Sequence, residues 1–575
     1  MSFHSYIQAR EVAKKLATGK SQQLTFAKKF IAGLVLAYYP SITSRPPITP
    51  SKHLLAKEMG DIARNLDEDL ASYLIGTTYT VMLPDKYRSK YGVYYTPPSL
   101  TQRLLDQAER NGVNWMDAKV LDPACGGGAF LAPIAKRMSN SLKDLSRSNR
   151  IKHIEARLSG FEIDPFSAWM SQVFVEIALK DDLNKLRRPL KQLVTICNSL
   201  DSSEAHYGQY DLVVGNPPYG KVKLLSEERA KWDRSLYGHA NLYGIFADLA
   251  TRLVSQNGII AYVTPTSFLG GQYFQALRSL LATEAHPTAF DFIAHREGVF
   301  ANVLQETLLS VYKKQTRRRL VSVSYLSVKE AGDLKVRQSG RYNIPVTPEL
   351  PWLFPRSPEQ SDLAHAIQQM PYRLSDLGYT VSTGPLVWNR HKNKLHNTKV
   401  TGCIPLIWAE CVDSTGAGVF TFKAMLRNHK LWFKPNKKDG ANIVSEACVL
   451  LQRTTSLEQA RRLIAAELPL SFIQNHGGEV TIENHLNMIR PSKDAIPVVS
   501  PSIITVLMNS DIVDQVFRCI NGSTAVSAYE LKSMPLPSPN DLQRLEELIV
   551  RNTRRATIEN AIREMYFNVR NIAAA

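Results

Sequence analysis

An amide and an aromatic ring are mounted on a stiff turn in the stretch DLVVGNPPYGKV, residues 211–222. Residues 212–214 read as a buried strand that Gly215 ends. The two prolines that follow lack an N–H and fix φ, so they can neither continue a strand nor enter the interior of a helix. Asn216 and Tyr219 are therefore predicted to lie on a rigid, exposed elbow at the carboxyl end of a strand. There they would offer hydrogen bonds and a stacking face to a ligand.

A glycine loop, DPACGGGAFL, connects a strand-like segment to a helical one. Gly126, Gly127 and Gly128 permit a tight turn and a close approach of the backbone to a ligand, although such loops also serve as plain turns. Glu162 ends the next predicted strand, where its carboxylate can accept bonds from two ribose hydroxyls; alternatively the stretch begins a helix with Asp164 as its cap. No Lys followed by Ser or Thr marks a phosphate-binding loop, which argues against ATP and GTP. S-adenosylmethionine is the obvious remaining ligand.

The elements that position these residues change character along the chain. Residues 1–88 read as a helical extension. In residues 89–330 apolar strand-like segments alternate with amphipathic helices, which predicts a mostly parallel sheet covered by helices. Residues 331–360 contain a Pro-rich linker, and residues 361–575 read as an irregular, mixed α+β domain. The predicted fold class is therefore α/β with two additional regions.

Bulk composition narrows the class of protein. With 575 residues the chain is too long for one ordinary core, and 44% hydrophobic and 21% charged residues are typical of a soluble globular protein. The sequence shows no membrane-spanning run and no secretory pattern, so we expect a cytoplasmic protein without a membrane partner. Six scattered cysteines without a CxxC pair predict neither disulfides nor a metal site. A net charge of +18 favours a polyanionic partner.

Three motifs in order, DPACGGGAFL, FEIDP and NPPY, resemble the signature of amino-group methyltransferases that use S-adenosylmethionine. The order is that of the gamma group of adenine-N6 DNA methyltransferases of restriction–modification systems. The stretch YGVYYTPPSLTQRLL resembles the family's extra cofactor motif, and VFANVLQETLLSVYKK resembles its region after the catalytic motif. The likeness covers about residues 91–320, with looser similarity in ENHLNMIRP and STAVSAYELKSMPLPSP. It implies a Rossmann-like methyltransferase sheet in residues 89–330 and a target-recognition DNA-binding domain in residues 361–575.

The resemblance also implies a cofactor site. Thr96 would bind the methionine carboxylate of the cofactor. Where the family usually carries an acid that contacts the cofactor's adenine amine, this chain has Asn198; its amide oxygen can accept the same bond, and Asp201 is the alternative. The expected cofactor-binding residues are Thr96, Asp122, Ala124, Gly126, Gly128, Glu162, Ile163, Asn198 and Asn216.

The elbow then acquires a catalytic role. The exocyclic amine of adenine is a poor nucleophile because its lone pair is delocalised into the ring. The Asn216 side-chain oxygen and the Pro217 carbonyl would accept its two hydrogens and favour a localised lone pair. A base inside a duplex cannot reach such a pocket, so the adenine must be flipped out and stack on Tyr219. Phe300 matches the family position of a second aromatic against the base, although it could equally fill the core.

Two basic segments, VWNRHKNKLHNTK and FKAMLRNHKLWFKPNKK, lie in the C-terminal region. Between Arg390 and Lys438 there are ten Lys or Arg and two acids. This density favours contacts to phosphates, with a solvated charged face as the alternative. The expected DNA-binding residues are Arg390, Lys392, Lys394, Lys434, Lys437 and Lys438.

Together these features predict a site-specific DNA methyltransferase acting on the N6 amine of adenine in double-stranded DNA, which would protect host DNA. The resemblance leaves room for a separate cognate restriction endonuclease as a partner. The alternatives are a methyltransferase for RNA or protein glutamine, and a DNA-specificity subunit without activity. Residues 1–88 contain no Asp…Glu-x-Lys cluster, so no cleavage activity is expected.

Overall fold

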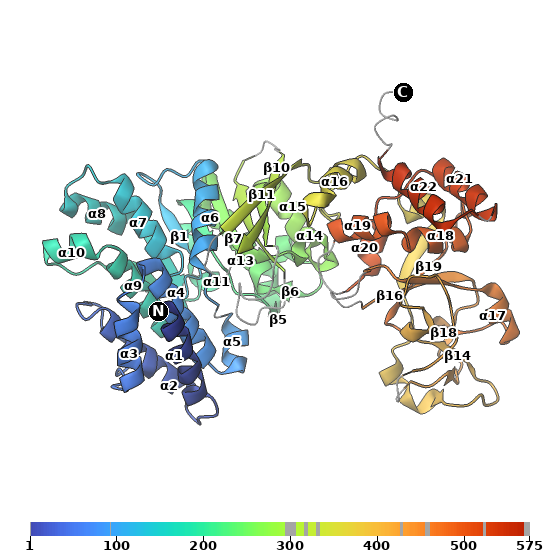
Figure 1. Cartoon of the computed structure of the whole chain (residues 1–575), viewed down its shortest axis with the longest axis horizontal. Coiled ribbons are helices and arrows are strands. Elements are labelled where there is room, and N and C mark those ends of the chain that lie inside the picture. The colour runs from blue at the N-terminus through green and yellow to red at the C-terminus, as the bar shows by residue number, and fades with distance from the viewer. Residues whose placement is uncertain are drawn as a thin grey trace. The chain divides into compact units, whose positions relative to one another are not determined.

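The computed structural model of the chain contains two compact units, shown in Figure 1. The first unit comprises Met1–Phe268 and Tyr273–Asn343, and the second comprises Leu269–Gln272 and Ile344–Ala575. Within them the structure describes residues 2–92, 94–293, 306–315, 320–328, 334–425, 429–454, 461–520, 525–551 and 553–567.

The first unit is built on a nine-stranded sheet in the order β11-β10-β8-β9-β7-β4-β1-β2-β3. Every strand runs parallel to the rest except β9 and β11, which pair antiparallel with their neighbours. The strands are β1 (Val120–Asp122), β2 (Leu158–Glu162), β3 (Val194–Ile196), β4 (Tyr210–Gly215), β7 (Val254–Pro265), β8 (His286–Ile293), β9 (Thr307–Lys313), β10 (Val321–Val328) and β11 (Leu334–Tyr342). A separate hairpin joins β5 (Lys221–Val222) to β6 (Ala240–Asn241). The predicted α/β class with a large central sheet is confirmed.

Helices surround this sheet in the first unit. They are α1 (Ser2–Ala17), α2 (Gln23–Tyr38), α3 (Leu54–Ala63), α4 (Glu68–Met82), α5 (Asp85–Tyr91), α6 (Pro98–Arg110), α7 (Leu131–Ser141), α8 (Arg147–Arg157), α9 (Pro165–Ala178), α10 (Lys180–Leu186), α11 (Ser199–Ser202), α12 (Ser226–Lys231), α13 (Leu242–Leu253) and α15 (Gln275–Glu284). The short α14 (Ser267–Gly270) has residues in both units.

Helix α9 explains how the N-terminal helices attach to the sheet. Every residue from Phe166 to Ile177 is buried, as expected for a helix that is covered on all sides. On one side α9 contacts β2 and β3, and on another its aromatic residues share a hydrophobic cluster with α1 to α4. The N-terminal helices therefore complete the core of the first unit.

The second unit contains two four-stranded sheets, in the orders β12-β19-β16-β17 and β13-β15-β14-β18. Its strands are β12 (Tyr379–Thr383), β13 (Leu395–His396), β14 (Ile404–Ile407), β15 (Trp432–Phe433), β16 (Cys448–Gln452), β17 (Ala465–Leu468), β18 (Thr481–Ile482) and β19 (Leu486–Pro491). Its helices are α16 (Ser361–Ile367), α17 (Leu470–Asn475), α18 (Pro501–Met508), α19 (Asp511–Ile520), α20 (Ala528–Lys532), α21 (Pro539–Val550) and α22 (Arg555–Phe567). Short strands joined by long connections agree with the irregular sequence pattern of this region.

Apart from the short segment Leu269–Gln272, the chain passes from the first unit to the second between residues 343 and 344, inside the predicted linker. The beginning of that predicted linker is part of the sheet, because β11 occupies Leu334–Tyr342. The predicted domain boundaries otherwise stay predictions. Within the described residues, no helix combines the length and apolar character that crossing a membrane requires.

Candidate functional site

A cavity of about 330 Å³ lies at the carboxyl ends of β1, β2 and β4. Parallel strands present these ends at one edge of a sheet, so the glycine loop, the acidic end of β2 and the elbow converge there. The volume falls in the range of pockets that hold small organic ligands. The predicted cofactor-binding residues that line it are Thr96, Asp122, Ala124, Gly126, Glu162, Ile163, Asn198 and Asn216.

Glu162 connects the end of β2 to the glycine loop. Its Oε2 accepts a hydrogen bond from the backbone N–H of Gly126 at 2.8 Å, and its Oε1 accepts one from Asp164 at 2.9 Å. Burial raises the pKa of the Glu162 carboxyl, although these bonds oppose the shift. Because each carboxylate oxygen can accept a second bond, Glu162 can still receive donors from a ligand in the cavity.

Asp164 is a helix cap, as the alternative interpretation of this stretch expected. Its Oδ2 accepts a hydrogen bond from the backbone N–H of Ser167 at 3.0 Å, at the start of α9. Glu162 faces the cavity two residues earlier. Asp164 also lines the cavity, so it combines the capping role with a position beside the ligand space.

Gly92 and Tyr95 contact the elbow and the glycine loop, respectively. A Cβ atom on Gly127 would lie 1.5 Å from the hydroxyl oxygen of Tyr95, so no larger residue fits beside this ring. Gly92 lies against Pro218 of the elbow. The Tyr95 side chain is buried at the cavity, and its hydroxyl has no hydrogen-bond partner within the described residues. This hydroxyl can donate to a polar ligand atom.

Asp122 is fully buried beneath the cavity. Its Oδ1 accepts from the backbone N–H of Ala124 at 3.0 Å, and burial raises the pKa of the Asp122 carboxyl to about 8. Gly215, which ends β4, has φ of 156° and packs directly on this carboxyl: a Cβ there would lie 2.6 Å from Asp122 Oδ1. The glycine that ends the strand thus allows Asp122 and the elbow to approach each other.

Two hydroxyl groups hold the amide of Asn216. Its Nδ2 donates to Thr96 Oγ1 at 3.3 Å, and its Oδ1 accepts from the Tyr219 hydroxyl at 2.7 Å. The same hydroxyl lies 3.2 Å from the carbonyl oxygen of Val263, a second acceptor. Burial raises the pKa of the Tyr219 phenol, so the group stays a donor at neutral pH. The ring packs edge-on against buried Tyr243.

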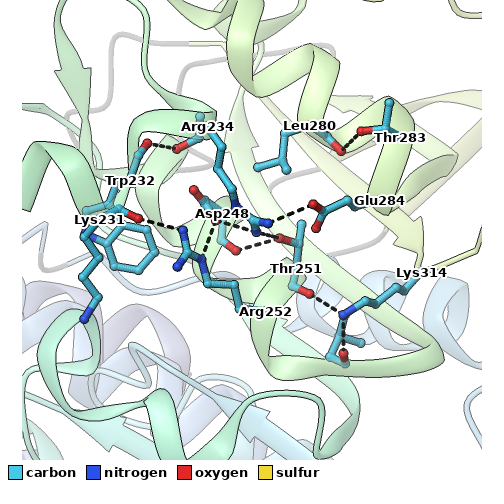
Figure 2. Close-up of polar contacts among 12 residues, drawn as sticks. Lys231, Trp232, Arg234, Asp248, Thr251, Arg252, Leu280, Thr283, Glu284 and Lys314 are labelled. Atoms are coloured by element: carbon cyan, nitrogen blue, oxygen red, sulfur yellow. Dashed lines mark hydrogen bonds and ion pairs between the residues drawn. The ribbon is translucent and has the colours of Figure 1, made fainter.

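The segment after the elbow supplies another wall of the cavity and is anchored by a charged cluster, shown in Figure 2. Asp248 of α13 is fully buried, and its Oδ1 accepts from Arg234 at 2.8 Å and from Arg252 at 2.9 Å. Arg234 also contacts Glu284 of α15 at 2.8 Å. Arg252 donates to the carbonyl of Lys231 at 2.8 Å. The cluster fixes the end of this segment, whose beginning borders the cavity.

Four of the predicted site residues that the structure describes lie outside the cavity lining or have another role there: Tyr219, whose hydroxyl bonds to Asn216, and Gly128, Asn198 and Pro217. Gly128 does not line the cavity; its Cα packs against Ser171 of α9 instead. Asn198 lines the cavity but caps α11, with its Oδ1 3.3 Å from the backbone nitrogen of Leu200. Pro217 is buried in the elbow outside the cavity lining. Phe300 lies outside the described residues.

Sequence reasoning missed several residues that line the cavity. Some come from the segment after the elbow and from α13, whose contribution no motif indicated. The missed lining residues include Tyr87, Tyr94, Tyr95, Cys197, Val222, Lys223, Leu224, Glu228, Leu242 and Phe246. Tyr94 and Tyr95 had an available signal, because they directly precede Thr96 in the motif YGVYYTPPSLTQRLL, and Cys197 directly precedes Asn198.

In the second unit the two basic segments meet in one sheet. β13 pairs with β15, and the backbone N–H of Lys434 donates to the carbonyl of Lys394 at 2.9 Å. Arg390, Lys392, Lys434, Lys437 and Lys438 are exposed. Lys394 differs, because its Nζ lies 2.6 Å from Oδ2 of buried Asp439. Its first function in the structure is therefore to hold a loop, while the five exposed residues remain accessible.

Comparison with known proteins relates this arrangement to a family. Residues 135–300 match the family described as Eco57I restriction-modification methylase. The chain is therefore similar to restriction–modification methyltransferases. Over most of its length the chain is similar to the Type II methyltransferase M.BsuBI of Bacillus subtilis, which is 25% identical over 506 residues, covering 85% of this chain and 96% of that protein. M.PstI of Providencia stuartii is 27% identical over 59% of this chain and 67% of its own length.

Solved structures agree at the level of the fold. The Type IIL restriction-modification enzyme MmeI, solved in complex with DNA, matches with a TM-score of 0.56 and 12% identity. The match covers 97% of this chain and 95% of that chain. The chain is therefore similar in fold to a restriction-modification enzyme.

Proposed function

We propose that this chain is a site-specific DNA methyltransferase that transfers a methyl group from S-adenosylmethionine to the N6 amine of an adenine flipped out of duplex DNA. The observation that carries the proposal is the shared cavity: the glycine loop, Glu162 and the amide of Asn216 border the same space. A group bound at the loop and a base held at the amide would be neighbours. In a restriction–modification system the reaction would protect host DNA.

The residues around the cavity fit S-adenosylmethionine. Glu162 has free acceptor positions for two ribose hydroxyls, and Ile163, a half-exposed apolar side chain, offers a surface for the adenine ring. The unpartnered hydroxyl of Tyr95 and the hydroxyl of Thr96 suit the methionine carboxylate. When bound, S-adenosylmethionine supplies an electrophilic methyl group.

The amide of Asn216 would prepare the base. Because an amide nitrogen only donates, its bond to Thr96 makes Oγ1 an acceptor and leaves the threonine proton for the cofactor. The same bond directs Oδ1 of Asn216 away from Thr96. From there Oδ1, together with the carbonyl of Pro217, would accept from the amine of adenine and localise the lone pair of its nitrogen.

Tyr219 would act through both its ring and its hydroxyl. The ring offers a stacking face to the flipped base, and its edge rests on buried Tyr243. The hydroxyl occupies Oδ1 of Asn216, the acceptor that the amine needs. Since Val263 presents a second acceptor 3.2 Å away, the hydroxyl can turn to it when the base arrives. The exchange would cost little, because one hydrogen bond replaces another.

DNA as the substrate is supported by the basic segments and by the relatives. Five exposed Lys and Arg residues of the second unit suit phosphate contacts. The relatives are Type II methyltransferases, and MmeI was solved with DNA. Adenine as the target base is supported by the NPPY elbow and its likeness to the adenine-N6 group.

Methyl transfer to different acceptors tests the proposal. The protein is incubated with labelled S-adenosylmethionine and unmethylated duplex DNA, RNA or bacterial protein, and the labelled product is identified by mass spectrometry. We expect N6-methyladenine in DNA, formed at least about a hundredfold more slowly by the Asn216→Ala variant. Label in N4-methylcytosine, in RNA or in glutamine would contradict the adenine-specific function.

Two substitutions at Tyr219 separate the ring from the hydroxyl. Tyr219→Ala should weaken capture of the flipped base by about 5- to 150-fold, because stacking is worth about 1–3 kcal/mol. Tyr219→Phe keeps the ring and frees Oδ1 of Asn216, and because the hydroxyl can otherwise turn to Val263 at little cost, capture should stay within about threefold of the wild-type value. The fluorescence of 2-aminopurine at the target position measures both. If base capture falls equally in the two variants, the Tyr219 hydroxyl itself is required, and it does not simply give way to the incoming base.

A further inference from the structure

A second recess lies in the first unit, between α6 and the last strands of the sheet. It encloses about 990 Å³ and shares no lining residue with the cofactor cavity. Figure 1 shows α6 next to β10 and β11. The recess, here called the α6 groove, is lined by Arg103, Gln107, Arg110, Asn111, Thr288, Ala289, Leu320, Ser322, Ser324, Val336, Gln338 and Arg341.

The α6 groove is at the opposite edge of the sheet from the cavity. Thr288 and Ala289 lie near the start of β8, and Ser322 is the second residue of β10. Both strands run parallel to the strands whose carboxyl ends border the cofactor cavity. A ligand in the groove would therefore bind away from the methyl-transfer site.

An irregularity in the edge strand directs Arg341 into the groove. Along β10 and β11, Ser324 pairs with Gln338, but Val323 pairs with Gly340 because the register shifts by one residue. Ser322 then pairs with Arg341, which puts Arg341 on the same face as Gln338. Without the extra residue, Arg341 would point to the other face of the sheet.

The groove face is polar where the rest of that face is apolar. Farther along the strands, Leu326, Val328 and Leu334 pack into the hydrophobic cluster that includes residues of α6. At the groove, the paired positions are instead Ser322 with Arg341 and Ser324 with Gln338. A sheet face meant to be covered by a helix would bury apolar side chains, so this part suits a polar ligand.

The charges of the groove are one-sided. Its floor holds a buried pair, in which Arg103 Nε lies 2.7 Å from Oδ2 of Asp291 and Gln107 donates to both carboxylate oxygens. Asp291 is thereby neutralised. Arg110 and Arg341 are exposed, and neither has an ion pair or hydrogen bond among the described residues. Two uncompensated guanidinium groups thus face a recess lined with hydroxyl and amide groups.

We propose that the α6 groove binds the sugar–phosphate backbone of a DNA segment outside the methyl-transfer site. Guanidinium groups match phosphate oxygens with two parallel donors, and Ser322, Ser324 and Gln338 supply neutral donors between them. A groove of this size suits an extended chain of phosphates better than one small anion. The two exposed arginines of the groove imply that its ligand is negatively charged. The identification of this ligand as DNA rests on the proposed function.

Lys335 provides a matched control on the same strand. It is exposed, carries the same charge, and pairs with Ser327, which places it on the face opposite the groove. Charged residues on an edge strand also prevent aggregation, and that role would be common to both faces. Exposed Lys152 of α8 completes a control variant with an equal change in net charge.

The first test measures duplex binding by the full chain as a function of salt. Phosphate contacts release counterions, so the removal of one such contact lowers the slope of log affinity against log salt by about one. Arg110→Glu with Arg341→Glu should lower the slope by about two, while Lys335→Glu with Lys152→Glu should leave it unchanged. A photoreactive benzoylphenylalanine at Gln338 should crosslink to a labelled duplex, and one at Lys335 should not.

An unchanged slope in the groove variant, or no crosslink from Gln338, would overturn the proposal. That result would also be obtained if the groove instead accepted an acidic protein segment. Neither measurement depends on methyl transfer. If the wild-type enzyme methylates adenine but the groove variant has the same salt slope as the wild type, only the proposal for the groove is rejected. A slope difference in a protein that methylates no adenine rejects only the proposed reaction.

Discussion

The carboxyl groups at the cavity of the first unit and two carboxyl groups in the basic region of the second unit have pKa values shifted in opposite directions. At the cavity of the first unit, burial raises the pKa of Asp122 and of Glu162. In the basic region of the second unit, the pKa values of Glu410 and Asp439 are lowered. Burial would raise them too, but a backbone N–H and His429 together act more strongly on Glu410, and Lys394 and Asn436 do so on Asp439.

This difference teaches what each group of acids is for. Asp122 and Glu162 accept bonds from backbone N–H groups and form no ion pair within the part of the chain that the structure describes, so their remaining capacity is directed to the cavity. Glu410 is paired with His429 and Asp439 with Lys394. These pairs hold the loops that carry the exposed basic residues. The carboxylates at the cavity therefore keep hydrogen-bonding capacity for a ligand, whereas those in the basic region are paired with cationic side chains and hold loops in place.

The largest expected effect is on catalysis at the cavity, without an effect on DNA binding by the basic region. Asn216→Ala should lower kcat by about 10²- to 10³-fold, as removal of one transition-state hydrogen-bond partner does. Binding of DNA and cofactor should stay near the wild-type level. Single-turnover methylation and equilibrium binding measure the two parts. Asn198→Ala is the control in the same cavity and should raise KM for the cofactor with little change in kcat; if both variants changed only KM, the catalytic role would be wrong.

The next largest effect concerns the exposed lysines of the basic region and their contacts to DNA phosphates. Changing the exposed Lys434, Lys437 and Lys438 to Glu should lower the salt slope of DNA binding by up to about three and leave cofactor binding unchanged. Fluorescence anisotropy at several salt concentrations gives the slope. A slope equal to that of the wild type would mean that these three lysines are simply solvated.

Lys394 sharpens the comparison within the same segment. Lys394→Met leaves buried Asp439 without its cation, so the free energy of unfolding should fall by about 1–3 kcal/mol. The salt slope should change by less than one, unlike that of the exposed lysines. Thermal unfolding and anisotropy distinguish the outcomes, and a stable variant with a reduced slope would assign Lys394 to DNA instead.

The smallest effect concerns pH. The pKa of Asp122 rises on folding from its usual value to about 8, so the folded state binds the proton more tightly. Its contribution to stability is therefore complete at low pH and is lost as the pH rises toward 8. Asp122→Asn should remove a decline in Tm on the order of a few degrees between pH 5 and 8. The same decline in the variant would place its origin elsewhere.

By itself the sequence determined the local features of this protein. The two prolines after Gly215 dictate the elbow, and Asp164 caps α9, because each feature depends on residues no more than a few positions away. The alternation of apolar segments with amphipathic ones likewise predicted the parallel sheet, because the apolar residues of each segment by themselves indicate that it is buried. These features needed no knowledge of distant partners.

Only the tertiary structure decided which distant groups meet. Thr96 reaches Asn216 across 120 positions, and Lys394 reaches Asp439 across 45, although neither pair shares a pattern that spacing could reveal. Arg341 faces the α6 groove only because one residue is added to the pairing of β11 with β10. Such contacts follow from how whole elements pack and register, which is set by the summed burial of many residues rather than by the residues in contact.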